Sequence, residues 1–470
     1  MSSESIASHP DRLLPADPAT RSIARGLLSE VEHLPIVSPH GHVPPAMIAD
    51  DTPFPDPTEL FISPDHYLTR LLHADGVDLA DLRVGGHRQT DPRESWRIFC
   101  RHWHLFDGTA TGYWLRSSFA NVFGIDDSKI DEAHADEIYD QFMELVQKPE
   151  FRPRALFDSF GIEVLATTDD PLDTLEPHDR VAADPSFRGR MLPTFRPDSY
   201  VQFAKPGFAD RVRRLIDEAG DGLTGYAGYL RAMENRRRYF IDHGAVSSDH
   251  GTHDALTLKL DDAEADRLLQ KGLAGQHTAE EAHAFEANMT YQFARMAVED
   301  GLVMTIHPGV HRNHSPETFA QFGPDTGHDI PFQMEYTRSL QPLLGDFGNQ
   351  KDFHLVLFTI DETVFSREIA PLAGFYPSVY IGAPWWFIDE PDAMARWRSA
   401  ITGTAGFSRS SGFIDDTRAF TSIPARHEAS RRTEASFLAR LVAEHRLSEE
   451  RAREIIVDIV DAAPRRAFKL

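Results

Sequence analysis

The 470-residue chain is predicted to be an α/β protein built on a distorted (β/α)8 barrel, the TIM-barrel fold. The main observation is a series of eight short apolar runs, most of them followed by segments with helical periodicity. Strands that alternate with helices form a parallel sheet, and eight such units suggest closure into a barrel. The length agrees, because barrels run from about 250 to more than 400 residues when they carry insertions.

Each predicted strand is a short apolar run that ends in polar residues. The runs are 34–38, 162–167, 191–195, 239–242, 302–306, 354–359, 378–382 and 412–415. Helical periodicity follows in segments such as 200–219 and 390–402.

Two gaps between the runs are too long for a plain crossover. Residues 39–161 contain aromatic, helical-looking segments at 93–106, 113–123 and 130–147, so we expect a mainly helical insertion over about residues 50–160. The second gap, 243–301, has a charged helical pattern from 261 to 300. The tail, about residues 430–470, is expected to form helices outside the barrel. Residues 1–470 are thus expected to form one decorated barrel domain.

The chain is acidic, with a net charge of −25 from 73 acidic and 48 basic residues. Nucleic acids and anionic membranes need an exposed basic surface, so neither is expected as a partner. A small anionic substrate needs only a few local arginines. Cys100 is the one cysteine, which excludes an intrachain disulfide, and no apolar stretch has signal-peptide or membrane-helix length. We expect a soluble cytoplasmic protein; its oligomeric state stays open, a homo-oligomer included.

The polar residues after the runs are the candidates for chemistry, because catalytic groups of such barrels lie at the C-terminal strand ends. His40 and His42 follow the first run, and side chains at i and i+2 of a strand point to the same side, so both imidazoles can meet one metal ion. The eighth run ends in Asp415 and Asp416, and an aspartate there could complete a His-His-Asp site with an open position. A second pair, His102 and His104, lies in a helical-looking stretch and is assigned to structure.

Further candidates follow other runs. His307 comes after the fifth run, with Arg312 five residues later, and Arg418 stands two residues after Asp416. An arginine here could clamp a carboxylate bidentately, although a surface ion pair is the alternative for each one singly.

Three more clusters are less specific. Phe195-Arg196-Pro197-Asp198 follows the third run, and Ser247-Ser248-Asp249-His250-Gly251 follows the fourth, where serine, aspartate and glycine indicate an ordinary turn. Pro384-Trp385-Trp386-Phe387 could wall a sugar pocket or belong to the core.

The motifs, taken in their order along the chain, resemble those of the uronate (glucuronate) isomerase family of the amidohydrolase superfamily. The resemblance extends from about Ser22 to the C-terminal helix. The matching motifs are Leu34-Pro35-Ile36 before His40 and His42, Asp65-His66-Tyr67, Phe195-Arg196-Pro197-Asp198, Ser248-Asp249-His250-Gly251, His307 with Arg312, Pro384-Trp385-Trp386-Phe387, Asp416-x-Arg418, Arg426-His427-Glu428 and Arg431-Arg432.

The resemblance implies a distorted barrel that interconverts D-glucuronate with D-fructuronate, and D-galacturonate with D-tagaturonate. It implies one divalent ion, for which zinc is expected ahead of manganese, cobalt or iron, held by His40, His42 and Asp416. We expect catalytic work from Asp416, His307, Tyr67 and Asp249, and contacts to the sugar acid from Arg196, Arg312, Arg418 and Trp385.

Two other functions stay open. A metal-dependent hydrolase or decarboxylase shares the His-x-His and aspartate pattern, but the predicted strand ends have no lysine to bridge a second metal. A non-catalytic barrel that binds sugar acids would need only the arginines. Incubation with D-glucuronate separates the three, since keto-sugar formation, water-dependent cleavage and no reaction are different outcomes.

Overall fold

The computed structural model describes residues 6–470 and has a parallel strand system at its centre. One sheet pairs β1 (Ile36–Ser38), β2 (Ile162–Ala166) and β3 (Arg190–Leu192). A second sheet pairs β4 (Thr194–Phe195), β5 (Ser247–His250), β6 (Val303–Ile306), β9 (Leu355–Leu357) and β10 (Val379–Ile381), again in chain order. All these pairs are parallel, as the alternation of runs and helices predicts.

Backbone hydrogen bonds connect the two sheets at both ends. At one end, the Asp169 amide donates to the Thr194 carbonyl (2.9 Å) and the Arg196 amide donates to the Asp169 carbonyl (3.1 Å). At the other end, the Ser411 amide donates to the Ile381 carbonyl (2.8 Å), and the His42 amide donates to the Thr417 carbonyl (3.0 Å). The segment from 409 to 417 thus fills the position between β10 and β1, and the predicted α/β barrel architecture is confirmed.

The prediction of a fourth strand at 239–242 is wrong. These residues form the last turn of α11 (Gly225–Asp242), and the strand at this position is β5, which begins five residues later. The sequence of β5 is Ser-Ser-Asp-His, and all four residues are buried. A strand whose polar side chains line a barrel interior has no apolar pattern, so the sequence indicates a turn at β5 and a strand at the apolar end of α11.

The prediction of an eighth strand at 412–415 is also displaced. The residue bridged to β10 is Ser410, and the ladder does not extend beyond it. Gly412 has φ +72° and Asp416 has φ +43°, both in the left-handed region that a strand excludes. These bends turn the chain toward β1 and the strand ends.

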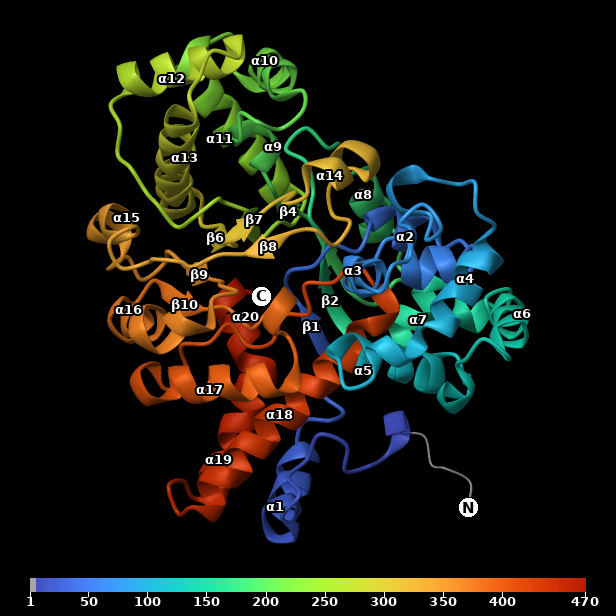
Figure 1. Cartoon of the computed structure of the whole chain (residues 1–470). Helices are drawn as coiled ribbons and strands as arrows, with labels where there is room; N and C mark the ends of the chain where they lie inside the picture. The colour runs from blue at the N-terminus through green and yellow to red at the C-terminus, as the bar shows by residue number, and fades with distance from the viewer. Residues whose placement is uncertain (1–5) are drawn as a thin grey trace.

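Six α-helices occupy the chain between β1 and β2. They are α2 (Pro45–Asp50), α3 (His66–Ala74), α4 (Pro92–Arg101), α5 (Ala110–Ser117), α6 (Ala135–Leu145) and α7 (Pro153–Ser159). An aromatic core that includes Trp96, Phe99, Phe119 and Phe142 holds them together. In Figure 1 they lie on the right of the strands.

The remaining helices surround the strands. They are α1 (Pro18–Leu28), α8 (Glu176–Ala182), α9 (Asp198–Val201), α10 (Phe208–Ala219), α12 (Asp262–Ala274), α13 (Ala279–Asp300), α14 (Pro316–Phe322), α15 (Gln341–Phe347), α16 (Ala370–Phe375), α17 (Pro391–Ala405), α18 (Ile423–Ala443), α19 (Glu449–Val457) and α20 (Ala463–Phe468). Figure 1 shows α10 to α13 as a group at the top and α1 beside α18 and α19 at the bottom. Leu27, Leu438 and Ile456 belong to the apolar cluster between these last three helices.

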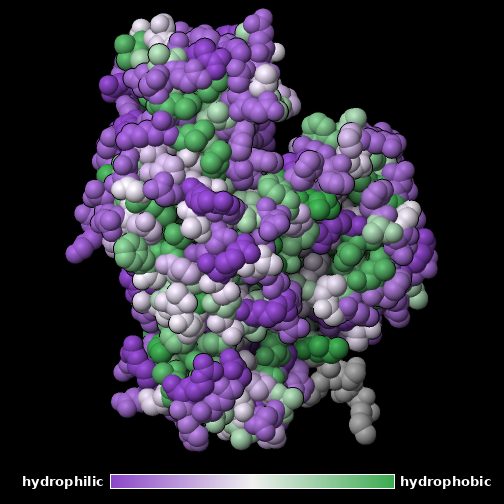
Figure 2. All heavy atoms as spheres, turned by 60° about the vertical axis from the view of Figure 1, so that its left-hand side comes forward, coloured by the Kyte–Doolittle hydropathy of each residue, from purple (hydrophilic) through white to green (hydrophobic). Residues whose placement is uncertain are grey.

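A short antiparallel pair, β7 (Val310–His311) and β8 (Ile330–Pro331), follows β6 and encloses the loop that contains α14. Among residues 6–470, no helix is long and apolar enough to cross a membrane. Hydrophilic residues predominate on the face shown in Figure 2, and hydrophobic ones form scattered patches.

Candidate active site

A cavity of about 1110 Å³ opens where the parallel strands end. Its lining includes His40 and His42 after β1, Asp249 near the end of β5, His307 after β6, and Asp416 after the Ser410 bridge. In an α/β barrel, this end of the strands is where the connecting loops build the active site. Five residues expected at or near strand ends therefore line one cavity.

Two histidines converge on one carboxylate oxygen. The Nε2 atoms of His40 and His42 lie 3.3 and 3.0 Å from Asp416 Oδ1. Within residues 6–470, Asp416 Oδ1 is buried and has no hydrogen bond of acceptable geometry, despite these short contacts. Three ligand atoms that crowd together without hydrogen bonding one another are arranged as they would be around a shared ion.

The two distances from Asp416 Oδ1 fit a small divalent ion, and all three ligand atoms lie within 4.8 Å of one another. Around a tetrahedral zinc ion with bonds of 2.0–2.1 Å, ligand atoms lie about 3.3 Å apart. Burial lowers the pKa of His42, which favours the neutral form that binds metal. Burial would raise the pKa of Asp416, but His40 and His42 outweigh it and hold this pKa well below its usual range. A metal ion fits these residues as donors.

Asp416, rather than Asp415, faces the histidines. Asp416 takes up the left-handed φ of +43°, and the two neighbouring side chains point to different partners. Asp415 Oδ2 lies 3.0 Å from His427 Nε2 on α18 instead. The strand-end pattern alone leaves the choice between the two aspartates open, whereas the resemblance implies Asp416, and Asp416 is the one whose carboxylate lies beside the two histidines.

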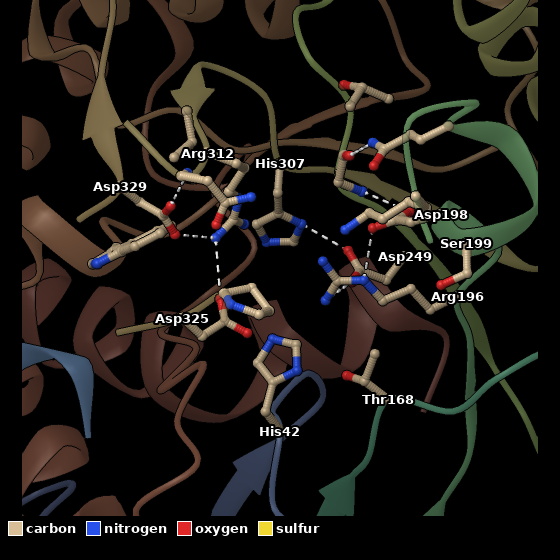
Figure 3. Close-up of a pocket in the computed structure, with 18 of the residues that line it drawn as sticks. His42, Thr168, Arg196, Asp198, Ser199, Asp249, His307, Arg312, Asp325 and Asp329 are labelled. Atoms are coloured by element: carbon tan, nitrogen blue, oxygen red, sulfur yellow. Dashed lines mark hydrogen bonds and ion pairs between the residues drawn. The ribbon is translucent and has the colours of Figure 1, made fainter. Parts of the chain in front are cut away.

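Asp249 holds three side chains beside the His-His-Asp group. Its Oδ1 accepts a hydrogen bond from Thr305 Oγ1 (2.9 Å) and lies 2.7 Å from His307 Nδ1, while its Oδ2 lies 3.1 Å from Arg196 Nη1. Figure 3 shows Arg196, Asp249 and His307 linked in a row. Burial would raise the pKa of Asp249, but Arg196 and the histidines hold it well below its usual range.

His307 is oriented by this contact. With Nδ1 on Asp249, its Nε2 is buried without a hydrogen-bond partner among the described residues and lies 3.9 Å from Asp416 Oδ2. Donor atoms of His40, Asp249 and His307 also lie within 4.8 Å of one another and form a second group that could hold a metal. Asp249 is already engaged by Arg196, so the first group has the less committed donors.

Two predicted arginines lie at the outer part of the cavity. Arg312 Nη1 is 3.0 Å from the buried Asp329 and 3.6 Å from Asp325. Figure 3 draws Arg312 beside both carboxylates. Arg418 Nη2 is 2.9 Å from the same Asp325. The side chains of Arg312 and Arg418 are 38% and 42% exposed, and both residues line the cavity.

Tyr67 and Trp385 complete the predicted set. Tyr67 is the second residue of α3, whose first turn is capped by Asp65, and its hydroxyl donates to Asp389 Oδ2 over 3.5 Å. Burial raises the pKa of Tyr67 well above its usual value, so the phenol stays protonated. Trp385 lines the cavity and contacts the His307 ring edge-on, with 4.8 Å between centroids. Trp385 therefore has both expected environments, since it lines the cavity and also belongs to a buried apolar cluster.

The other histidine pair lies elsewhere. His102 ends α4, and its Nδ1 is 2.7 Å from the Ile98 carbonyl oxygen. Neither His102 nor His104 belongs to a candidate metal group within residues 6–470.

Several residues of the site are missing from the sequence-based set. They are His66, Asp325, Asp329, Asp389 and Arg426. Arg426 and His66 belong to motifs that match the family, but the resemblance implies no role for either residue. Asp325 precedes Thr326-Gly327 and reads as a turn, so no local signal separates it from other loop aspartates.

Comparison with known proteins decides the family. Residues 19–468 match the sequence model of the family described as glucuronate isomerase. The chain belongs to this family. A uronate isomerase of Corynebacterium efficiens is 65% identical over the full length of both chains, and one of Cutibacterium acnes is 50% identical, again over both full lengths.

Solved structures of the family have the same fold. The glucuronate isomerase from Caulobacter crescentus superposes with a TM-score of 0.96 at 45% identity, covering 99% of this chain and 97% of that one. The uronate isomerase from Thermotoga maritima gives 0.90 at 28% identity, covering 98% and 99%. Family membership confirms the resemblance, the barrel fold and the prediction of an enzyme of the isomerase class.

Proposed function

We propose that the enzyme interconverts D-glucuronate and D-fructuronate, and D-galacturonate and D-tagaturonate, by moving a proton between C2 and C1. The observation that carries this proposal is the His40, His42 and Asp416 group in the same cavity as Arg312 and Arg418. An aldose–ketose shift of a sugar acid needs a base near C2, polarisation of the carbonyl, and a contact for the C6 carboxylate. The cavity offers residues for all three.

We propose that His40, His42 and Asp416 hold one divalent ion, with zinc expected ahead of manganese, cobalt or iron. Nitrogen and oxygen donors accept several of these ions, so the residue set does not select one. When bound, such an ion supplies Lewis-acid polarisation of a sugar oxygen.

Proton transfer is assigned to Asp416. Its carboxylate is ionised, since its pKa lies well below the usual range, and Oδ2 is the oxygen turned toward His307 rather than toward the pair after β1. In the proposed step, Oδ2 takes the proton from C2, the C2–H electron pair forms the C1=C2 double bond, and the C1=O π pair moves onto O1 to give an enediolate. A proton then passes from the C2 hydroxyl to O1, and the C1=C2 pair takes the proton back from Oδ2 at C1 as the ketone forms at C2.

In this proposal, His307 and Tyr67 form hydrogen bonds with the oxygen atoms of the sugar. Asp249 fixes His307 through Nδ1, which leaves Nε2 to face the cavity. The Tyr67 phenol keeps its proton, and in the proposed step it turns this proton from the 3.5 Å contact with Asp389 Oδ2 to a sugar oxygen that gains charge. The buried Asp249 and the partly exposed Arg196 then support His307, and Trp385 forms the wall against which the sugar packs.

The test is incubation of the purified enzyme with D-glucuronate and D-galacturonate, with the products identified by NMR. The proposal predicts the 2-keto acids with no loss of carbon and no net use of water. Release of carbon dioxide or hydrolysis would support a decarboxylase or hydrolase instead. Binding of both acids without any reaction would support the non-catalytic alternative.

A further inference from the structure

Arg426 is an almost completely buried cation at the edge of the cavity, with 2% of its side chain exposed. It lies in the first turns of α18, and its guanidinium stacks on Trp114 of α5, with 3.5 Å from Cζ to the ring centroid. A buried charge of this kind is costly unless it is paired and hydrogen bonded. Its partners therefore indicate what the residue does.

The first partner connects Arg426 with Tyr67. Nη1 of Arg426 donates to Asp389 Oδ2 over 2.6 Å, and the Tyr67 hydroxyl donates to the same oxygen over 3.5 Å. The Arg426 Cζ also lies 5.5 Å from the centroid of the Tyr67 ring. Trp114 contacts this ring edge-on at 5.7 Å, so the phenol is held on several sides.

The second partner connects Arg426 with the turn that carries Asp416. Nη1 also donates to the main-chain carbonyl of Asp415 (3.3 Å), which belongs to the peptide bond that leads into Asp416. Nε donates to Ser422 Oγ (3.1 Å). Asp416 has φ +43°, which costs a non-glycine residue energy and persists only where the surroundings enforce it.

We propose that Arg426 is a positioning residue that, together with Asp389, holds the Tyr67 hydroxyl and the Asp416 turn at a fixed separation across the cavity. A planar guanidinium can donate to Asp389, Ser422 and a carbonyl at once, whereas a lysine ammonium in the same place cannot match this fork or stack on Trp114. The inference rests on the proposed function, since it assumes that Tyr67 and Asp416 act on the sugar.

The chain offers a matched control for this proposal. Arg398 of α17 is also buried (1% exposed), stacks on Trp397, and pairs with Glu434 over 2.6 Å, but it does not line the cavity. Arg426→Lys and Arg398→Lys should therefore both lower the melting temperature. A purely structural role for Arg426 predicts that the two variants also have similar kinetics.

The experiment measures kcat, KM for D-glucuronate, metal content and melting temperature for both lysine variants and for Asp389→Asn. We expect Arg426→Lys to lose about 100-fold in kcat, the scale of a 1 Å misplacement in an active site, with KM and metal content close to wild type. Asp389→Asn should lose kcat in the same way to a smaller extent. Arg398→Lys should keep the wild-type kcat.

Two further variants distinguish a failure of the positioning role of Arg426 from a failure of the proposed function. If Tyr67→Phe and Asp416→Asn lose turnover while Arg426→Lys and Asp389→Asn keep it, the positioning role alone is overturned. If Tyr67→Phe and Asp416→Asn keep full turnover, the proposed function fails and the inference fails with it. Should Arg426→Lys not fold, Asp389→Asn decides by the same criteria.

Discussion

Arg418 and Arg312 are the side chains best placed to receive the carboxylate of a sugar acid. Each keeps more than a third of its surface exposed, and Arg418 has one carboxylate partner, Asp325, among the described residues. The remaining donors of the guanidinium are free to bind a second carboxylate. A charge-assisted hydrogen bond contributes about 1.5–3 kcal/mol.

Arg418→Lys and Arg312→Lys keep the charge but lose the planar fork. Each should lower kcat/KM for D-glucuronate by about 10- to 150-fold, because 1.4 kcal/mol corresponds to one decade. Glucose lacks the carboxylate, so the preference of the wild-type enzyme for glucuronate over glucose should shrink in both variants. An unchanged preference in both would exclude these arginines as the carboxylate contact and leave Arg196 to test.

At the residue scale, the sequence predicts the side chains that follow strands and misses those that loops bring into the cavity or into contact with its lining residues. His40 and His42 could be found because two imidazoles at i and i+2 after an apolar run share a direction. Asp325 and Asp389 could not, because each becomes part of the site only through a contact far away in the sequence, with Arg418 and with Arg426.

At the element scale, β5 shows how a strand can carry the site without an apolar pattern. Its four polar residues are buried, and Gly251 follows at the strand end. A methyl group on Gly251 would lie 2.7 Å from Asp198 Oδ2 and 2.9 Å from Arg196 Nη2. The absence of a side chain at 251 lets Arg196 approach Asp249.

Gly251→Ala should therefore push Arg196 away from Asp249 and lower kcat/KM by roughly 10- to 100-fold. The melting temperature should change little, because the displaced atoms are the ends of side chains. Gly403→Ala is the matched control: nothing lies within 4 Å of the added methyl group, and the position is in α17. Wild-type kinetics in Gly251→Ala would show that activity does not depend on the contact between Arg196 and Asp249.

The strands that could be predicted are those with apolar residues on both faces. The runs at β1, β2, β6, β9 and β10 are buried against helices outside and other side chains inside. Their apolar composition therefore indicates that they are buried strands. The run at 239–242 has the same composition but belongs to a helix, because its apolar residues continue the buried side of α11. Short apolar runs alone do not separate these cases.

At the scale of the whole molecule, the metal group connects distant parts of the chain. His40 and His42 lie after β1, whereas Asp416 precedes α18, so a bound ion would join the first barrel strand to the C-terminal segment. An ion that binds only the folded chain stabilises it by about 2.7 kcal/mol when its free concentration is 100 times Kd.

Protein purified without chelator should contain close to one divalent ion per chain, and removal of the ion should lower the melting temperature. The double variant His40→Ala, Asp416→Ala should lose the ion and no longer respond to chelator. His102→Ala should keep both, because the His102 ring contacts the carbonyl of Ile98 in the last turn of α4 and not the metal group. A full ion in the double variant would contradict the assignment of the ligands.

The central claim is that a proton, taken from C2 by a group that faces the cavity, moves to C1. The most direct test is NMR of D-glucuronate incubated with the metal-loaded enzyme in heavy water. Because Asp416 Oδ2 lies in a cavity that opens to solvent, the account predicts that deuterium enters C2 of the recovered glucuronate as D-fructuronate accumulates. Formation of the keto acid with no deuterium at C1 or C2 of either sugar would contradict it and indicate a hydride shift.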